Sequence, residues 1–376
     1  MKQKLVLAAT LAGVYFTISI AQAGYTLGPM TSFGFNGDGW WAPSENGYTY
    51  LTTTGNERAI AYGNNHVYLS AGASGPVRIL DKITGVDLGS LNVTGISGGA
   101  RALVGIGVAS DGAIYAANLQ TALSGTATYK VYRWANEAAA PVNVYSGNPL
   151  TGARLGDSFD VFGSGAGTRV VAGYAASPAI AGNNGYVVVD PTAGTGTHIA
   201  FTGTPPAAGD FRLGITFAGN TTTVIGDQGN SATDTRLTTY AGGIGTLNAT
   251  LSITAAAERQ MDYVLINGNP YLATVEATSL ASGSTTRVYE MSGPSPVLVA
   301  TGKLATTANS NGNGSGGVAW GDPYYDSVLE VWKAPLYSMN ANNGLQAFIF
   351  QIPEPGSLGL FGLGALMAWL LRRRSS

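Results

Sequence analysis

The sequence predicts an all-β protein, most simply a β-propeller, and three observations lead to this prediction. Between Gly24 and Ile352 the apolar residues show almost no helical periodicity. The same stretch holds many short runs of β-branched, aromatic or alternating residues, which glycine, proline, Asn-Gly or Asp-Gly interrupt. These runs recur in groups of four over a period of roughly 40 to 60 residues, which is typical of propeller blades.

Each run has the usual length of a β-strand, roughly four to eight residues. Turn-forming residues bound the runs, and no stretch between them has the length or the period of an amphipathic helix. The runs with the sharpest boundaries are Val67–Ser70, Val77–Leu80, Ala113–Ala116, Lys130–Trp134, Arg169–Ala172, Tyr186–Val189, Thr222–Ile225, Arg287–Glu290 and Val297–Ala300.

An arginine marks the start of most predicted units. After it come a first strand and then further strands separated by turns. The arginines with this phase are Arg58, Arg101, Arg154, Arg212 and Arg259. The clearest unit is Arg101–Gly147, with strands predicted at Leu103–Ala109, Ile114–Asn118, Tyr129–Trp134 and Val142–Tyr145.

A last unit lacks the arginine and supplies only three strands, predicted at Gly316–Trp320, Val328–Trp332 and Leu345–Ile352. Tyr48–Thr53, which precedes the first arginine, is expected to add the fourth strand and close the ring, because an open edge strand favours aggregation. The resulting interpretation is six four-stranded blades, with five or seven as alternatives. A β-helix or an array of sandwiches is a further alternative, but neither explains a four-strand period of this length.

Residues 1–23 have the pattern of a secretory signal peptide. Two lysines lie near its start, and Leu5–Ile20 is apolar. A small-residue cleavage site follows, formed by Ala21, Gln22 and Ala23. We therefore expect export by the Sec machinery and cleavage by signal peptidase before Gly24, with an uncleaved anchor as the alternative.

Residues 353–376 combine three features in a fixed order. The triplet Pro353, Glu354 and Pro355 precedes the apolar span Gly356–Leu371, and a basic cluster follows, formed by Arg372, Arg373 and Arg374. A helix of this span is about 24 Å long, somewhat less than the roughly 30 Å hydrocarbon core. A buried core helix is the alternative. We expect a single hydrophobic helix in the membrane, because the arginines suit the cytoplasmic side.

These features together resemble the PEP-CTERM sorting signal, which is found on exported proteins of Gram-negative bacteria that make extracellular polysaccharide. The resemblance covers only the C-terminal segment. It implies that an exosortase, a membrane-embedded processing enzyme, cuts near Pro353–Pro355. The chain would then be held transiently in the inner membrane before it is released or re-anchored at the cell surface.

A second resemblance concerns the stretch from Gly72 to Gly147. Its runs VRILDKITGVDLGSLNVTGISGG and DGAIYAANL are similar to a repeat of an uncharacterised, propeller-like family of exported bacterial proteins. This resemblance implies a fold and no activity. The expected organisation is a signal peptide over residues 1–23, a propeller over 24–352 and a sorting signal over 353–376.

Composition excludes several classes of function. The chain contains no cysteine, which excludes disulfides, thiolate catalysis, cysteine-bound zinc and iron–sulfur clusters. Of the 19 basic and 21 acidic residues, five and one respectively lie in the two end segments, which leaves 14 against 20 and a net charge near −6 for the exported domain. An acidic domain without a basic cluster is a poor partner for nucleic acid.

The phased arginines allow two interpretations. If each begins an innermost strand, they surround one mouth of a central channel and can bind the carboxylates of a polyanion. Alternatively, each arginine forms an ion pair with a neighbouring acid and holds adjacent blades together. Such a structural role is the commoner one for a repeated residue in a repeat protein. The candidate acidic partners are Glu57, Asp157, Asp210, Glu258 and Asp262.

Few residues suit catalysis. His66 and His198 are the only histidines, and no G-x-S-x-G motif is present, so neither a serine triad nor a histidine-rich metal site is predicted. A pair of carboxylates roughly 5–9 Å apart could hydrolyse a glycoside. The candidates for such a pair are Asp157, Asp160 and Asp262.

No cofactor is predicted. Calcium is conceivable in the oxygen-rich loops Asn36–Gly39 and Asn309–Gly317, although neither has EF-hand spacing and a turn explains both. Trp40 and Trp41 lie outside the repeats and are candidates for stacking on sugar rings, although propeller blades also pack on large aromatic residues.

Together these features favour a cell-surface or biofilm-matrix protein that binds exopolysaccharide or a partner protein through one mouth of the propeller. A glycan-active hydrolase or lyase with channel carboxylates is the main alternative, and a purely structural envelope component is another. Two acids that face each other across the channel would favour the enzyme. A mouth lined by hydroxyl groups and aromatic rings would favour binding.

Overall fold

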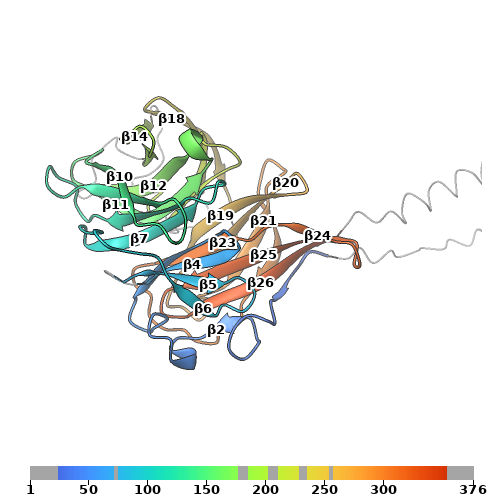
Figure 1. Ribbon diagram of the computed structural model, residues 1–376. Coiled ribbons are helices and arrows are strands. Elements are labelled where there is room, and N and C mark those ends of the chain that lie inside the picture. Colours follow the sequence, from blue (N-terminus) through green and yellow to red (C-terminus); the bar gives the residue numbers. More distant parts are fainter. Residues whose placement is uncertain are drawn as a thin grey trace, which may run out of the picture. The chain divides into compact units, whose positions relative to one another are not determined.

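A computed structural model describes residues 24–71, 75–176, 185–201, 211–227, 235–253 and 257–353. These residues form β-strands joined by turns and by two single-turn 3-10 helices, η1 (Glu45–Gly47) and η2 (Gly165–Gly167) (Figure 1). The all-β prediction is thus confirmed for this part of the chain. Within the same residues, no helix has the length and apolar character needed to span a membrane.

Three sheets are antiparallel meanders whose four strands follow chain order. The first contains β3 (Glu57–Gly63), β4 (His66–Ala71), β5 (Val77–Asp81) and β6 (Asp87–Ser90). The second contains β7 (Arg101–Val108), β8 (Ile114–Leu119), β9 (Tyr129–Trp134) and β10 (Val142–Gly147), and it is the unit that the sequence defines most clearly. The third contains β19 (Glu258–Ile266), β20 (Asn269–Glu276), β21 (Thr286–Glu290) and β22 (Val297–Gly302).

An eight-stranded sheet consists of two further meanders. One contains β11 (Ala153–Phe162), β12 (Arg169–Ala176), β13 (Gly185–Asp190) and β14 (Thr195–Phe201). The other contains β15 (Gly214–Phe217), β16 (Thr223–Asp227), β17 (Thr235–Ala241) and β18 (Ile244–Leu251). They join through a short parallel pairing between β14 and β18.

The last sheet takes strands from both ends of the described chain. Its path runs through β23 (Gly316–Trp320), β25 (Val331–Asn340), β26 (Leu345–Pro353) and β1 (Thr26–Pro29). β2 (Trp40–Trp41) also pairs with β26, and β24 (Tyr324–Asp326) pairs with β25. Figure 1 shows the blue β2 beside the red β26, so residues far apart in the sequence close this sheet.

The prediction that Tyr48–Thr53 supplies the closing strand is wrong, because β1 pairs with β26 in that position. Tyr48 stacks between Trp41 and Tyr50, with ring centroids 4.6 and 5.0 Å apart, and this segment is a loop packed on the core. Aromatic residues are common in strands because they suit a half-buried surface, and in this segment they occupy such a surface in a loop. The strand predicted at Val328 begins only at Val331, because Val328 lies in the exposed turn after β24.

Adjacent sheets share their hydrophobic cores, which gives a propeller-like arrangement. The first strands contact one another in a closed cycle, in the order β3, β7, β11, β15, β19 and β23. Each cluster of buried apolar residues lies between one meander and the next; one cluster, for example, joins Tyr68 of β4 to Trp134 of β9. Second strands such as β8 are buried throughout, whereas outer strands such as β10 are half exposed.

Glycine allows the first strands to approach closely. A Cβ atom on Gly105 of β7 would lie 2.4 Å from the Cβ atom of Phe159 in β11. One on Gly317 of β23 would lie 2.6 Å from the backbone nitrogen of Ile60 in β3. Side chains at these positions would push the strands apart, so the small residues set the width of the central channel.

Candidate functional site

The first strands line a central channel and run along it in the same direction. Their earlier residues, such as Asp157 and Gln260, line a cavity of about 30 Å³. Their later residues, such as Asp160 and Asp262, line a cavity of about 120 Å³. Both cavities are lined by one apolar layer, which consists of Ile60, Ile106, Phe159, Met261 and Val318. The channel therefore has two ends separated by apolar side chains.

Asp160 and Asp262 meet in the larger cavity. Burial raises the pKa of Asp160 to about 6. Burial and then the charge of Asp160 raise the pKa of Asp262 to about 7. The structure thus brings together two of the three acids proposed for catalysis, while Asp157 lines the smaller cavity.

Both carboxylates join their own strand to the next first strand. Asp160 accepts the backbone N–H of Phe217 at 2.7 Å and the hydroxyl of Thr216 at 3.1 Å. Asp262 accepts the backbone N–H of Trp320 at 2.8 Å. Each also accepts the N–H of the residue that follows it. These hydrogen bonds hold neighbouring strands together and account for both oxygens of each acid.

A hollow of about 400 Å³ lies at the channel end beyond these acids, and a second hollow of about 420 Å³ extends from Tyr62 and Asp322 outward along β25, β26 and β1. We call this end the aromatic mouth and define it by the rings and the acid that line the hollows: Tyr62, Tyr263, Trp320, Asp322, Tyr324 and Tyr337. Tyr62 and Asp322 line both hollows. The smaller polar groups around them include Asn64, Lys82 and Ser110.

Tyr62 is fixed at the centre of the aromatic mouth. Its hydroxyl donates a hydrogen bond to Asp322 at 2.7 Å, and its ring stacks on that of Tyr337 with centroids 5.9 Å apart and planes at 11°. Burial and the Asp322 carboxylate raise the pKa of Tyr62, so the hydroxyl remains a donor at neutral pH. The sequence did not single out Tyr62, Tyr263 or Tyr337, because their strands meet only in the fold.

The opposite end carries the phased arginines, and we call it the arginine mouth (Arg58, Arg101, Arg154, Arg212 and Arg259). Asp157 acts as the expected partner: it accepts hydrogen bonds from Arg154 at 2.5 and 2.6 Å and from Arg212 at 2.9 Å. Arg58 donates to the hydroxyl of Ser315 at 2.7 Å, and Arg259 contacts the carbonyl of Ala277 at 3.4 Å.

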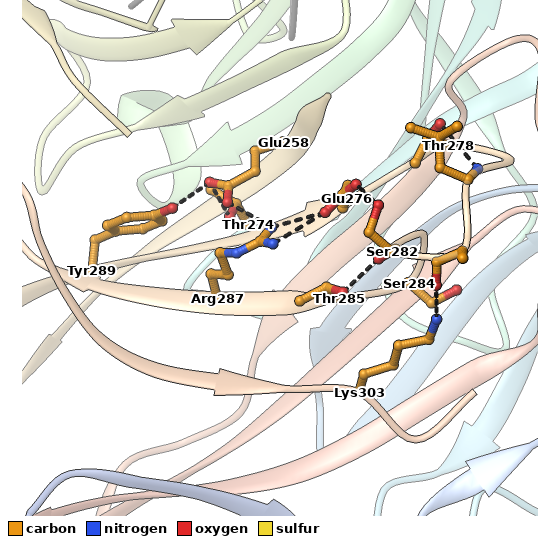
Figure 2. A network of polar contacts seen from close by, with 12 residues as sticks. Glu258, Thr274, Glu276, Thr278, Ser282, Ser284, Thr285, Arg287, Tyr289 and Lys303 are labelled. Carbon is orange, nitrogen blue, oxygen red and sulfur yellow. Dashed lines mark hydrogen bonds and ion pairs between the residues drawn. The ribbon is translucent and has the colours of Figure 1, made fainter. Parts of the chain in front are cut away.

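The other acids proposed as partners of the phased arginines are engaged elsewhere. Glu57 accepts the backbone N–H of Asn342 at 2.9 Å. Glu258 lies 2.7 Å from Arg287 and accepts the Tyr289 hydroxyl at 2.6 Å (Figure 2). Asp262 bonds to backbone groups as described above, and Asp210 lies outside the described residues.

Figure 2 shows how this fold uses an arginine structurally. The Arg287 guanidinium lies between two buried carboxylates, 2.7 Å from Glu258 and 3.1 Å from Glu276. Thr274 donates a further hydrogen bond to Glu258 at 3.0 Å. Such a network joins β19, β20 and β21 and gives the buried Arg287 a carboxylate on either side.

The remaining candidates have local roles in the described part of the chain. Trp40 and Trp41 are 9% and 2% exposed, so the proposed sugar-stacking pair is wrong: both rings are buried. Their indole N–H groups donate to the carbonyls of Asn343 and Thr84. His66 contacts Glu137 at 2.6 Å, and His198 contacts the hydroxyl of Tyr174 at 2.9 Å.

The two loops considered for calcium are held by their own hydrogen bonds. In the first, Asp38 accepts the backbone N–H of Trp40 at 2.9 Å. In the second, Asn311 donates to Asn340 at 2.6 Å. Across the described ranges, no group of three or more histidine, cysteine, aspartate or glutamate residues is arranged to hold a metal ion.

The C-terminal segment is identified by comparison with known proteins. The PEP-CTERM protein-sorting motif matches residues 351–374, which include the predicted Pro-Glu-Pro triplet and the three terminal arginines. This motif implies an exported protein that an exosortase processes. Apart from Pro353 and Gly24, the residues predicted for sorting and for signal cleavage lie outside the described residues.

The fold is similar to that of a solved DUF4623 family protein from Bacteroides eggerthii. The TM-score is 0.59 at 17% sequence identity, over 83% of this chain and 73% of that one. At this identity the similarity concerns the fold alone.

Two further solved structures are less similar. A candidate oxidoreductase (glucose dehydrogenase) from Thermus thermophilus has a TM-score of 0.39 at 10% identity, over 78% of this chain and 96% of that one. A candidate 6-phosphogluconolactonase from Bacteroides uniformis has a TM-score of 0.37 at 13% identity, over 78% and 82%. TM-scores this low do not establish a common fold or function. The comparison with curated proteins gave no match.

Proposed function

We propose that this protein is an exported, non-enzymatic binding protein that holds exopolysaccharide at the aromatic mouth. The observation that carries the proposal is the pair of hollows, about 420 and 400 Å³, that share Tyr62 and Asp322. Volumes of this size are usual for small-molecule sites. Aromatic rings offer flat apolar faces to sugar rings, while fixed hydroxyl and carboxylate groups bind the sugar hydroxyls.

The sorting motif supports a route to the cell surface. In this route the signal peptide is removed before Gly24, and the span Gly356–Leu371 holds the chain transiently in the inner membrane. Exosortase then cuts near the Pro-Glu-Pro triplet, and the domain is released or re-anchored in the biofilm matrix. A binding domain that arrives by this route would meet the polysaccharide outside the cell.

We infer that the domain is a propeller of six blades. Three features support this count: the cycle of contacts among β3, β7, β11, β15, β19 and β23, the four-strand meander that begins at each, and the core cluster between each meander and the next. β1 then acts as the outer strand of the last blade. Because the first and last blades meet through β3 and β23, the ring of blades closes, and a closed propeller leaves only short edge strands.

A glycan hydrolase or lyase remains the alternative, because Asp160 and Asp262 influence each other's ionisation. Two observations weigh against it. Their cavity of about 120 Å³ lies inside the ring of first strands. In addition, backbone N–H groups occupy the carboxylate oxygens that catalysis would require.

The decisive experiment uses a chain from Gly24 to Pro353, which contains every described strand. It is applied to an array of bacterial polysaccharides, and the same polysaccharides are tested for release of reducing ends or unsaturated products. We expect binding to at least one polysaccharide and no turnover. Turnover would establish the alternative, and a folded protein that binds none of the glycans would overturn the proposal.

A further inference from the structure

We propose that the arginine mouth binds the carboxylate groups of an acidic polysaccharide, with Arg58 and Arg101 as the principal contacts. This inference rests on the proposed function and adds to it a second binding site, whose ligand is a uronate-containing polymer. It concerns the end of the channel opposite the aromatic mouth, beyond the apolar layer.

Arg58 is buried, and no carboxylate of the described residues forms an ion pair with it. Its side chain lies at the start of β3 with only 7% of the residue exposed. Its Nη1 atom donates to the Ser315 hydroxyl, whereas its buried Nε atom has no hydrogen-bond partner among the described residues. A buried guanidinium is normally paired with an acid, because an uncompensated charge in the interior is costly.

Arg101 places a second positive charge beside the first. It begins β7, which contacts β3, and it is only partly buried. Burial, followed by the charge of Arg101, lowers the pKa of Arg58 to about 10. No carboxylate of the described residues forms an ion pair with either side chain. Within the described ranges, these two neighbouring guanidinium groups therefore have no ion-pair partner.

Asp157 and Glu57 attract Arg58 from a distance, but neither forms an ion pair with it, because both are engaged elsewhere. Asp157 binds both Arg154 and Arg212. Glu57 is fully buried and accepts the backbone N–H of Asn342 at 2.9 Å. By contrast, other arginines with structural roles have acids in place: Arg287 has two, and Arg169 lies 3.0 Å from Asp190. Arg58 and Arg101 differ from these arginines because no carboxylate of the described residues is ion-paired with them.

A uronate polymer fits the missing anion. The guanidinium group is a planar donor that binds carboxylates through two parallel hydrogen bonds, and Arg58 and Arg101 come from adjacent first strands. Each uronate residue carries one carboxylate among hydroxyl groups, so the polymer can present its charges in sequence across the mouth. Binding of this kind is electrostatic in part and should weaken as salt increases.

The test measures binding of a uronate polymer, polygalacturonate, and of neutral dextran to the Gly24–Pro353 chain by titration calorimetry at low and high salt. The variants are Arg101→Gln and Arg58→Gln. Arg169→Gln is the matched control, because Arg169 pairs with Phe162 at the far end of β11 and therefore lies towards the opposite mouth. We expect Arg101→Gln to weaken polygalacturonate binding at least tenfold and Arg169→Gln to change it less than twofold.

Arg101→Gln keeps the test valid if Arg58→Gln does not fold, since the described residues give Arg101 no hydrogen bond or ion pair to lose. Polygalacturonate binding that is unchanged in folded Arg101→Gln would overturn the inference. So would competition by inorganic sulfate at an equal carboxylate-equivalent concentration, because it would indicate a general anion site. Binding of neutral glycans without any binding of polygalacturonate would overturn this inference and leave the proposed function standing. Binding of neither polygalacturonate nor dextran would also overturn this inference, whereas the proposed function is overturned only if no polysaccharide of the array binds.

Discussion

Raising the pH from 5 to 8 should destabilise the folded domain, because Asp160 and Asp262 must then ionise inside the channel. Their pKa values are raised to about 6 and about 7, mainly by burial. An acid whose folded pKa lies above its unfolded pKa, about 3.9 for aspartate, favours the fold at low pH. That contribution is lost as the pH rises through the folded pKa, so the window runs from about pH 4 to pH 7.

The size of this effect follows from the pKa values. At about 1.4 kcal/mol per pKa unit, linkage between pH 5 and pH 8 gives a loss of about 2 to 3 kcal/mol for Asp262. Asp160 adds about 1 kcal/mol in the same direction. The assay is urea unfolding at both pH values, followed by tryptophan fluorescence, because Trp41, Trp134 and Trp320 are buried.

The control is the double variant Asp160→Asn and Asp262→Asn, which cannot ionise at either position. Its absolute stability will differ, because an amide group replaces one acceptor with a donor. Its pH slope should nevertheless be flatter than that of the wild type. Glu57, Glu258 and His198 also have shifted pKa values, but they are present in both proteins and cancel in the comparison. Equal slopes in the two proteins would refute the reasoning.

Three other predictions concern stability. Asp157→Asn should lower the free energy of unfolding by about 1 to 3 kcal/mol, because two partly buried arginines lose their shared carboxylate; an unchanged urea midpoint would contradict this. Gly105→Val should cost about 1 to 3 kcal/mol by overpacking against Phe159, whereas a melting temperature at or above that of the wild type would show that the strands can separate. Deletion of Gly356–Ser376 should leave the melting temperature unchanged, since every described strand ends by Pro353; a large decrease would mean that the tail stabilises the domain.

Much of the fold could be predicted because the information is local. Strand length, turn residues and a four-strand period identified the unit Arg101–Gly147 almost residue by residue. The closing strand could not be identified in the same way. Thr26–Pro29 is short and contains glycine and proline, while Tyr48–Thr53 has the stronger strand composition. Only the tertiary pairing with β26 favours the weaker segment.

The candidate sites were less accessible to prediction, because they depend on contacts between distant residues. Tyr62 and Tyr337 stack at one mouth although 275 positions separate them in the sequence. The regular spacing of the arginines correctly predicted that they lie at the starts of units. The sequence could not identify the residues that bind them. Glu258, for example, precedes the phased Arg259 and was a candidate partner for the phased arginines, but it pairs with Arg287 from another strand.

The most direct test of the central claim compares two adjacent tyrosines in glycan binding. Tyr324 and Tyr325 are each 43% exposed, but only Tyr324 lines a hollow of the aromatic mouth, while Tyr325 packs against Trp332. The measurement is the Kd for the polysaccharide that binds best on the array. We predict that Tyr324→Ala raises this Kd roughly tenfold, equivalent to about 1.4 kcal/mol, and that Tyr325→Ala changes it less than twofold. Equal effects of the two substitutions, or none from Tyr324→Ala, would contradict the account.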